Sequence, residues 1–353
     1  MKEVKEVKEI KEVEKIEAKK IEMPVQTSEI NLKLSKKKYD KVDILEGTKI
    51  LFSMFDSKRI LRFDLENKVF KLIEFADFGN FEYNYTAQGS IFLNILDGLL
   101  IVTGENHDLF YNYSHSKHTM NKIAKLTESH DLGSLVYIEL TNTVACISGR
   151  STKSVESYCN DDILSNYLKK KFKKIQNNNK TKNTWSKLPD LNNERTECPF
   201  IFVDNKYLYG FFGYDCSQKQ YLDSIERINL ESLVNWEIVE YKNEGNVSTL
   251  RKAHSLVKIN ENELLFIGGY DGSEDAAFEN FAFFNLKKME ITQGDEKFPE
   301  ISRNKFYNFQ KNNNSSPFID VNNKLHYSAI DEKNAVHIVE AKSLQYDLFI
   351  FFD

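Results

Sequence analysis

The sequence of 353 residues has little glycine, little proline, few cysteines and no long apolar run. With only 14 glycines and 5 prolines, many turns have to be made by other residues, and asparagine is the best suited of these. The four cysteines have no Cys-x-x-Cys spacing, which is typical of free thiols in a reducing compartment: Cys146, Cys159, Cys198 and Cys216. The longest apolar run, Leu348–Phe352, is far below the roughly 18 residues of a membrane span. We therefore expect a cytoplasmic chain without a membrane span.

Charge is nearly balanced. Lys and Arg number 48, Asp and Glu number 53, and the formal net charge is -5. This argues against a dominant phosphate-binding surface, so nucleic acid is not an expected partner. A basic run at 169–174 lies within a Lys/Asn-rich insertion at about 161–182. We interpret it as a solvated loop, with contact to nucleic acid or acidic lipid as the alternative.

The first 22 residues are a low-complexity Lys/Glu/Val tract. Its composition favours a helix. Its apolar residues recur every third position from Val4 to Ile16, so their stripe drifts around a helix and a long coiled coil is not favoured. A solvated helix and a short partner-binding helix both remain open. Because the tract has no apolar core segment, we expect no secretory signal. We divide the chain into a charged, helical extension (1–27) and one domain (28–353).

From about residue 40, short apolar and aromatic runs alternate with turn residues, which is typical of β-strands. One pattern, an apolar strand, a turn and a second apolar strand, occurs six times. We number these repeats one to six. The predicted hairpins lie at 41–53, 90–104, 134–149, 199–213, 254–269 and 317–329. Because the second strand is almost wholly apolar, we expect it to be buried on both faces.

A second signature follows each hairpin. An apolar or aromatic residue precedes a bulky one, usually by seven positions, and we expect these pairs to be equivalent in six four-stranded sheets. The pairs are Phe63 and Phe70, Tyr113 and Met120, Tyr158 and Trp185, Ile228 and Trp236, Phe284 and Ile291, and Val339 and Tyr346. The insertion at about 161–182 separates the members of the third pair.

Three segments resemble the kelch repeat: Gly268–Gly272, the run Tyr221–Trp236, and Thr184–Pro189. The resemblance covers about residues 40–353 and implies an all-β fold, a six-bladed kelch-like β-propeller with four strands in each blade. The physics of stacked sheets agrees with this, because neighbouring blades must share cores. Glycine at the end of the second strand would permit close backbone approach or positive φ, and the bulky residue would fill the space between blades.

Catalytic motifs are not evident. The glycines at 268–272 lack the lysine of a phosphate-binding loop, and no GxSxG or HExxH sequence occurs. We expect four histidines to lie at the surface, with a zinc site as the alternative: His107, His115, His118 and His130. Cys146 lies in an apolar strand and should be a buried thiol. We therefore expect no catalytic residue, cofactor or metal. A metal-dependent oxidase, which a kelch propeller can carry, is the disfavoured alternative.

Loop residues suited to recognition stand before the first strands and after the second strands. The kelch resemblance implies that these two loop sets share one face, and Arg and Tyr are favoured at binding surfaces. The candidate partner-binding residues are Arg150, Arg195, Tyr214, Arg251 and Tyr270. Alternatively, Arg195, Arg251 and Arg303 hold neighbouring loops together by hydrogen bonds.

The expected function is a non-catalytic protein–protein interaction module. In this interpretation the chain is a cytosolic scaffold or adaptor that binds another protein or an extended polar peptide. The alternative is a cytoskeletal or ciliary structural subunit. The sequence does not indicate an oligomeric state.

Overall fold

A computed structural model gives the fold of most of the domain. The described residues are 50–54, 59–64, 69–74, 78, 91–95, 98–103, 108–138, 141, 143–159, 184–245, 247–271, 276–278, 280–297, 318–319, 324–330, 336–342 and 345–351. Throughout these ranges the regular structure is β-strand, and no α-helix occurs in them. The extension 1–27, the insertion at 161–182, His107 and Arg303 lie outside the described residues.

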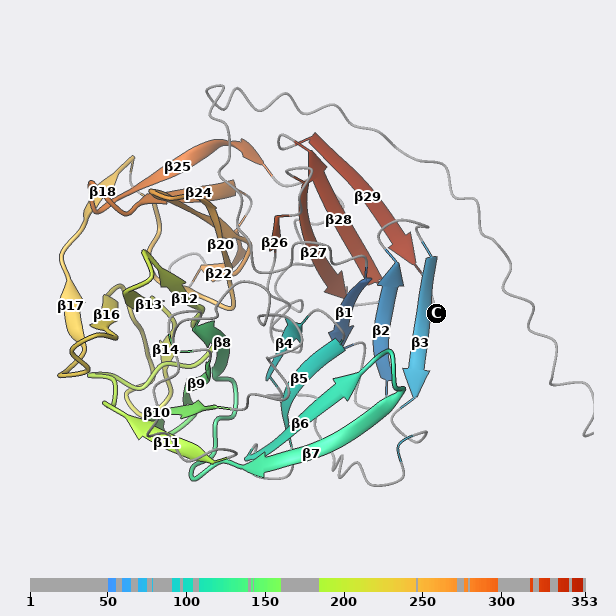
Figure 1. Cartoon of the computed structure of the whole chain (residues 1–353). Helices are drawn as coiled ribbons and strands as arrows, with labels where there is room; N and C mark the ends of the chain where they lie inside the picture. The colour runs from blue at the N-terminus through green and yellow to red at the C-terminus, as the bar shows by residue number, and fades with distance from the viewer. Residues whose placement is uncertain are drawn as a thin grey trace, which may run out of the picture.

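Six main sheets follow one another along the chain, and Figure 1 shows them arranged one after another around the molecule. The first has three described strands, β1 (Ile50–Met54), β2 (Arg59–Asp64) and β3 (Val69–Glu74). The second has β4 (Ile91–Ile95), β5 (Gly98–Thr103), β6 (Leu109–Ser114) and β7 (Thr119–Lys125). The third has β8 (Ser134–Ile138), β9 (Thr143–Gly149), β10 (Thr152–Tyr158) and β11 (Trp185–Leu188).

The remaining three main sheets continue this order. The fourth has β12 (Phe200–Val203), β13 (Tyr207–Phe211), β16 (Ile225–Asn229) and β17 (Glu237–Val239). The fifth has β20 (Ser255–Asn260), β21 (Glu263–Ile267), β24 (Asn280–Asn285), β25 (Glu290–Lys297) and an added strand, β18 (Lys242–Glu244). The sixth has β26 (Phe318–Ile319), β27 (Lys324–Ile330), β28 (Val336–Lys342) and β29 (Gln345–Phe351).

Two small sheets lie in the loops. One pairs β14 (Tyr214–Asp215) with β15 (Gln220–Tyr221), and the other joins β19 (Arg251–Lys252), β22 (Tyr270–Asp271) and β23 (Ala276–Ala277). Neighbouring main sheets touch through their leading strands: β1 with β4, β4 with β8, β8 with β12, β12 with β20, and β20 with β26. Among the described strands, no ladder joins the sixth sheet to the first.

Strand register agrees with the predicted repeats. The third-strand residue lies directly opposite the bulky residue in four sheets: Phe63 and Phe70, Tyr113 and Met120, Tyr158 and Trp185, and Phe284 and Ile291. In the fourth sheet the ladder ends at the adjacent pair, Arg227 and Glu237.

The sixth repeat corrects one expectation. Val339 lies opposite Leu348, and Tyr346 lies opposite Ala341 instead. The cause is the length of the turn. The ladder closes at Lys342 and Gln345, so its connection is two residues shorter than the one between Asn285 and Glu290, and the register shifts by two.

Three apolar cores lie between successive sheets, from the second to the fifth. Trp185 packs in the core between the second and third sheets, Trp236 between the third and fourth, and Ile291 between the fourth and fifth. Every described residue of β9 is buried, as are Leu208–Phe211 of β13 and Leu264–Ile267 of β21. The expectations of buried second strands and of bulky residues between sheets are therefore confirmed in this part of the chain.

The glycines after the second strands have the two properties expected of them. Gly213 has φ +102°, and a Cβ there would lie 3.0 Å from the Thr196 carbonyl oxygen. Gly269 has φ +99°, and a Cβ there would lie 2.7 Å from the Lys252 carbonyl oxygen. Each glycine thus permits a left-handed backbone and close contact with the segment that enters the same sheet.

The fifth sheet has one strand more than expected. β18 follows β17 of the fourth sheet after only two residues, Glu240 and Tyr241, and pairs in parallel with β25. The outer edge of the fifth sheet is therefore covered by the chain that leaves the fourth. Strand β18 is short and polar, so it carried no strand signal in the sequence.

Candidate functional site

The loops that carry the candidate residues meet at one end of the third, fourth and fifth sheets. Leu132, Glu197 and Ala253 hold the same place, just before the first strand of each sheet. Glu197 N donates to Leu132 O at 2.9 Å, and Ala253 N donates to Glu197 O at 2.8 Å. All three have positive φ, of 59°, 52° and 53°. We call this chain of backbone contacts the rim.

The loops after the second strands bind to the same rim. Arg150 N donates to Asp131 O at 2.7 Å, and Tyr214 exchanges backbone hydrogen bonds with Thr196 at 2.9 and 3.1 Å. Lys252 lies opposite Tyr270 in the small sheet of β19 and β22. The structure therefore brings both predicted loop sets together in these three repeats. Whether they bind a partner stays a prediction.

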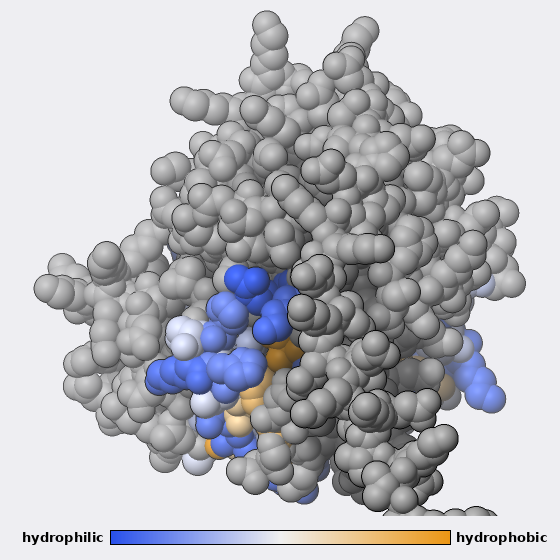
Figure 2. Space-filling model, turned by 90° about the vertical axis from the view of Figure 1, so that its right-hand side faces the viewer, coloured by the Kyte–Doolittle hydropathy of each residue, from blue (hydrophilic) through white to orange (hydrophobic). Residues whose placement is uncertain are grey.

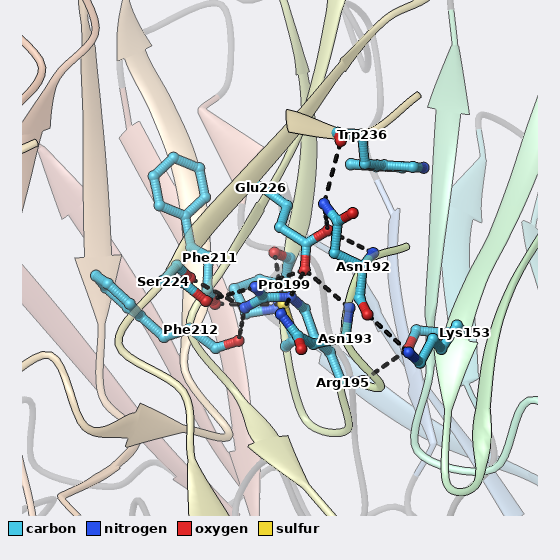
Figure 3. A network of polar contacts seen from close by, with 12 residues as sticks. Lys153, Asn192, Asn193, Arg195, Pro199, Phe211, Phe212, Ser224, Glu226 and Trp236 are labelled. Atoms are coloured by element: carbon cyan, nitrogen blue, oxygen red, sulfur yellow. Dashed lines mark hydrogen bonds and ion pairs between the residues drawn. The ribbon is translucent and has the colours of Figure 1, made fainter. Parts of the chain in front are cut away.

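Arg195 is the centre of a buried polar cluster (Figure 3). Its guanidinium contacts the carboxylate oxygen Oε1 of Glu226 through Nε at 3.1 Å and Nη2 at 2.8 Å. It also donates to the carbonyl oxygens of Phe212 at 2.6 Å and Ser224 at 3.0 Å. The side chains of Arg195 and Glu226 are both 0% exposed. We call these four residues the Arg195 cluster.

Glu226 also anchors the segment that enters the fourth sheet. Its carboxylate accepts the backbone N–H of Asn192 at 2.8 Å and of Asn193 at 3.3 Å. The side chain of Asn192 donates in turn to the carbonyl oxygen of Trp236 at 3.1 Å (Figure 3). One carboxylate on β16 therefore fixes the segment before β12 to the interior of the sheet.

These contacts correct the expectation for Arg195 and Arg251. Arg195 is 0% exposed and Arg251 is 1% exposed, whereas a side chain that binds a partner must be accessible. For Arg195 the alternative, a loop-holding role, is what the contacts describe. Arg251 lies with its guanidinium carbon 3.6 Å from the centre of the Phe278 ring. On β24, Ala282 holds the position that corresponds to Glu226, because it lies opposite Phe266 as Glu226 lies opposite Gly210.

The third sheet contains a histidine version of the cluster. His130 is fully buried; its Nε2 lies 3.2 Å from Glu156 Oε1, and its Nδ1 lies 2.6 Å from Ser148 O. Glu156 also accepts the backbone N–H groups of Thr127, at 3.0 Å to Oε2, and of Glu128, at 3.0 Å to Oε1. We call His130, Glu156 and Ser148 the His130 cluster. The prediction of a surface His130 was wrong, because its segment turns inward at the rim.

The pKa of His130 is raised and the pKa of Glu156 is lowered. Burial alone would lower the pKa of His130, but contacts with Cys146, Glu156 and the Ser148 carbonyl outweigh burial and raise this pKa to about 10. Burial would raise the pKa of Glu156, but hydrogen bonds from His130 and Thr127 lower it below its usual value. The folded protein therefore favours the ion pair.

The other histidines lie apart from this cluster. His115 is half-buried and its Nε2 accepts a hydrogen bond from Arg62 Nε at 3.2 Å, while His118 is exposed. His254 is 3% exposed and packs against the rings of Phe212 and Phe266, which also contact each other. Neither ring nitrogen of His254 has a hydrogen-bond partner in the described part of the chain. Burial, together with the charge of Arg251, lowers the pKa of His254 well below its usual value.

Cys146, His130 and Glu156 have the residue types of a nucleophilic triad, but their arrangement does not suit one. Cys146 is 0% exposed, so a substrate has no access to its sulfur. His130 interacts with Cys146 as well as with Glu156 and the Ser148 carbonyl, so the burial of Cys146, rather than a missing contact with His130, argues against a nucleophile. Cys146 is therefore a buried thiol, as expected. Across the described ranges, no group of three or more His, Cys, Asp or Glu residues is placed to hold a metal ion.

Three of the candidate residues are accessible on the loops that contact the rim. Arg150 is exposed, and its Nε lies 3.3 Å from Asp131 Oδ2 in a pair with side chains 58% and 17% exposed. Tyr214 and Tyr270 are half-buried. The Tyr214 ring packs edge-to-face on the Tyr221 ring, with 5.1 Å between their centroids. Lys252 Nζ lies 5.1 Å from the centroid of the Tyr214 ring.

Large apolar side chains are exposed at four described positions: Leu233, Val234, Ile238 and Leu250. Figure 2 shows the side that faces right in Figure 1, where the described surface is mostly hydrophilic with a small apolar area. None of the described segments forms a helix long and apolar enough to cross a membrane.

The sequence could have indicated the two carboxylates. Glu156 and Glu226 each stand two positions before the third-strand residue of the second signature, Tyr158 and Ile228. A basic residue precedes each first strand in the same two repeats. A basic residue and a glutamate at corresponding places in two repeats indicate an internal ion pair, although the fifth repeat has Arg251 with Ala282 in the place of the glutamate.

No protein-family model matches the chain, and no curated protein is similar to it. The kelch name therefore stays a resemblance carried by the residues quoted above.

Proposed function

We propose that the chain is a non-catalytic protein–protein interaction module, built as a six-bladed, kelch-like β-propeller that acts as a cytosolic scaffold or adaptor. The main support is the order of the sheets. Six successive sheets, antiparallel apart from the added strand β18, touch through their leading strands, and their strands occur in the order that the repeats predict. Stacking of this kind buries both faces of each sheet, as a propeller requires.

The binding surface in this proposal is the accessible rim around Arg150, Tyr214 and Tyr270. Arg150 offers a guanidinium that is 58% exposed and can therefore exchange Asp131 for the carboxylate of a partner at little cost. The two half-buried tyrosines offer rigid rings with a polar end, which suits a polar peptide. The buried Arg195–Glu226 pair and the backbone hydrogen bonds of the rim support this surface by fixing the loops.

Affinity purification with mass spectrometry tests the proposal. Full-length protein is compared with Arg150→Ala, Tyr214→Ala and Tyr270→Ala, after circular dichroism shows that each variant is folded. Lys206→Ala is the matched control, because Lys206 lies in the turn between β12 and β13, at the opposite end of the fourth sheet. We expect a partner that is lost or weakened by about 1–3 kcal/mol in the rim variants and retained by the control.

If every partner binds all three rim variants as tightly as the wild type, the rim is not the recognition surface. If turnover of a substrate is found instead, the proposal of a non-catalytic module fails.

A further inference from the structure

His130 occupies the position that Arg195 occupies in the next sheet. Each stands five residues before a first-strand residue, Leu135 or Phe200, that lies opposite the second strand at Cys146 or Gly210. Three residues further on, each second strand reaches its glycine, Gly149 or Gly213. The two clusters are therefore the same site in successive repeats, with an imidazole in one and a guanidinium in the other.

The acceptors at the two positions also correspond. The carbonyl that faces the basic group belongs to Ser148 in one sheet and to Phe212 in the other, with φ of 55° and 58°. The carboxylate belongs to Glu156 or Glu226, and it accepts two backbone N–H groups from the segment that enters the sheet. Arg195 donates to both kinds of acceptor.

A neutral imidazole cannot donate a hydrogen bond to both the carbonyl and the carboxylate. It has one N–H group and one lone pair, yet both nitrogens of His130 face oxygen atoms that can only accept, at 2.6 and 3.2 Å. Glu156 already accepts the amides of Thr127 and Glu128, so it is the ionised carboxylate that fits this place. Only the imidazolium satisfies both acceptors.

We propose that His130 is a buried proton-binding site, in which one bound proton replaces the fixed charge of Arg195 and makes the junction between the second and third sheets dependent on pH. That junction is the segment from Leu126 to Gly133, which links β7 to β8 and is tied to β10 through Glu156. Leu126 itself packs in the core shared by the two sheets. The junction at Arg195 has no titrating group in the corresponding place, because arginine stays charged.

The groups that face His130 are Glu156 on β10, Cys146 on β9 and the Ser148 carbonyl. The direction of the effect follows from the raised pKa of His130. A proton held more tightly in the folded state stabilises it fully below the unfolded pKa of about 6.5. That stabilisation is lost as pH rises from about 6.5 toward the folded pKa of about 10.

The test uses the full chain and measures denaturant unfolding between pH 6 and pH 9.5. In the wild type, the unfolding constant should rise up to about tenfold per pH unit above pH 6.5 through this one group. His130→Arg should remove that rise, and Arg195→His should add a second one. His118→Gln is the matched control, because His118 is exposed, and it should behave as the wild type does.

Hydrogen exchange locates the effect. After correction for intrinsic rates, the amides of Thr127 and Glu128 should lose more protection as pH rises than those of Asn192 and Asn193, whose protection should fall only as far as global unfolding requires. Equal pH dependence of unfolding in the wild type and His130→Arg would overturn the proposal. If His130→Arg does not fold, nitrogen NMR of the wild type decides: two protonated ring nitrogens at pH 7.5 support the proposal, and one protonated nitrogen refutes it.

Discussion

Removing one partner of the Arg195–Glu226 pair should strongly destabilise the fourth sheet. Both side chains are 0% exposed, so Arg195→Met leaves the Glu226 carboxylate buried without its cation. Breaking a buried pair in this way costs about 3–5 kcal/mol. Two carbonyl oxygens, of Phe212 and Ser224, lose their donor as well, at about 1 kcal/mol each where water does not replace it. Total stability is about 5–15 kcal/mol, so a large share of it would be lost.

The assay is equilibrium unfolding in denaturant, followed by fluorescence of the buried Trp185 and Trp236. Glu226→Gln removes the charge and keeps one acceptor oxygen, so it loses the ion pair together with either the Asn192 contact or the Arg195 and Asn193 contacts. The double variant removes both charges and should lose less than the two single losses added together, by about 1–3 kcal/mol. Arg150→Met is the control, because the Arg150 side chain is 58% exposed in its pair with Asp131, and this pair should contribute at most about 1 kcal/mol.

Two results would refute this reasoning. One is a loss for Arg195→Met as small as that for Arg150→Met. The other is strict additivity in the double variant, which would mean that the two side chains do not interact in the folded protein.

Three further predictions concern the cores, acid pH and the extension. Trp236→Ala should cost about 3–5 kcal/mol, because Trp236 fills the core between the third and fourth sheets; denaturant unfolding measures this, and a loss below about 1 kcal/mol would contradict it. His254→Phe should weaken the fall in stability below pH 6.5, since a histidine whose pKa is lowered by burial makes the folded state less stable as pH falls; equal acid limbs in melting curves would contradict this. Deleting residues 1–27 should change the free energy of unfolding by less than about 1 kcal/mol, and loss of folded protein on deletion would show that the tract packs on the domain.

The strands were predictable because their signals are local. Alternating and continuous apolar runs, with turn residues between them, predicted the hairpins, and the seven-residue spacing predicted equivalent residues in successive repeats, such as Tyr113 and Met120, which the structure places opposite each other. The spacing failed at Tyr346, where a shorter turn shifts the register. Turn length there depends on residues that carry no strong turn signal of their own.

The polar clusters were harder to predict because their partners are distant in sequence. Arg195 and Glu226 are separated by 31 positions, and nothing local to Arg195 distinguishes a buried guanidinium from an exposed one. A basic residue in a loop is most often exposed, which is why Arg195 and Arg251 were assigned to a binding surface. The loops were expected at one end of the sheets, but the direction of a side chain such as Arg195 depends on contacts with residues far away in the sequence, such as Glu226.

Strand β18 has a consequence for how the chain reaches its final form during synthesis. It pairs with β25, which leaves the ribosome only after β19 to β24 have done so. The fourth sheet can therefore complete its own hydrogen bonds before β25, the strand that pairs with β18, has been synthesised. Until β25 arrives, the backbone groups of Lys242–Glu244 are available to other nascent chains, and its polar, charged side chains disfavour such pairing. The arrival of β25 both completes the fifth sheet and ends this exposure, so the last step in forming the fifth sheet also fixes the chain that leaves the fourth.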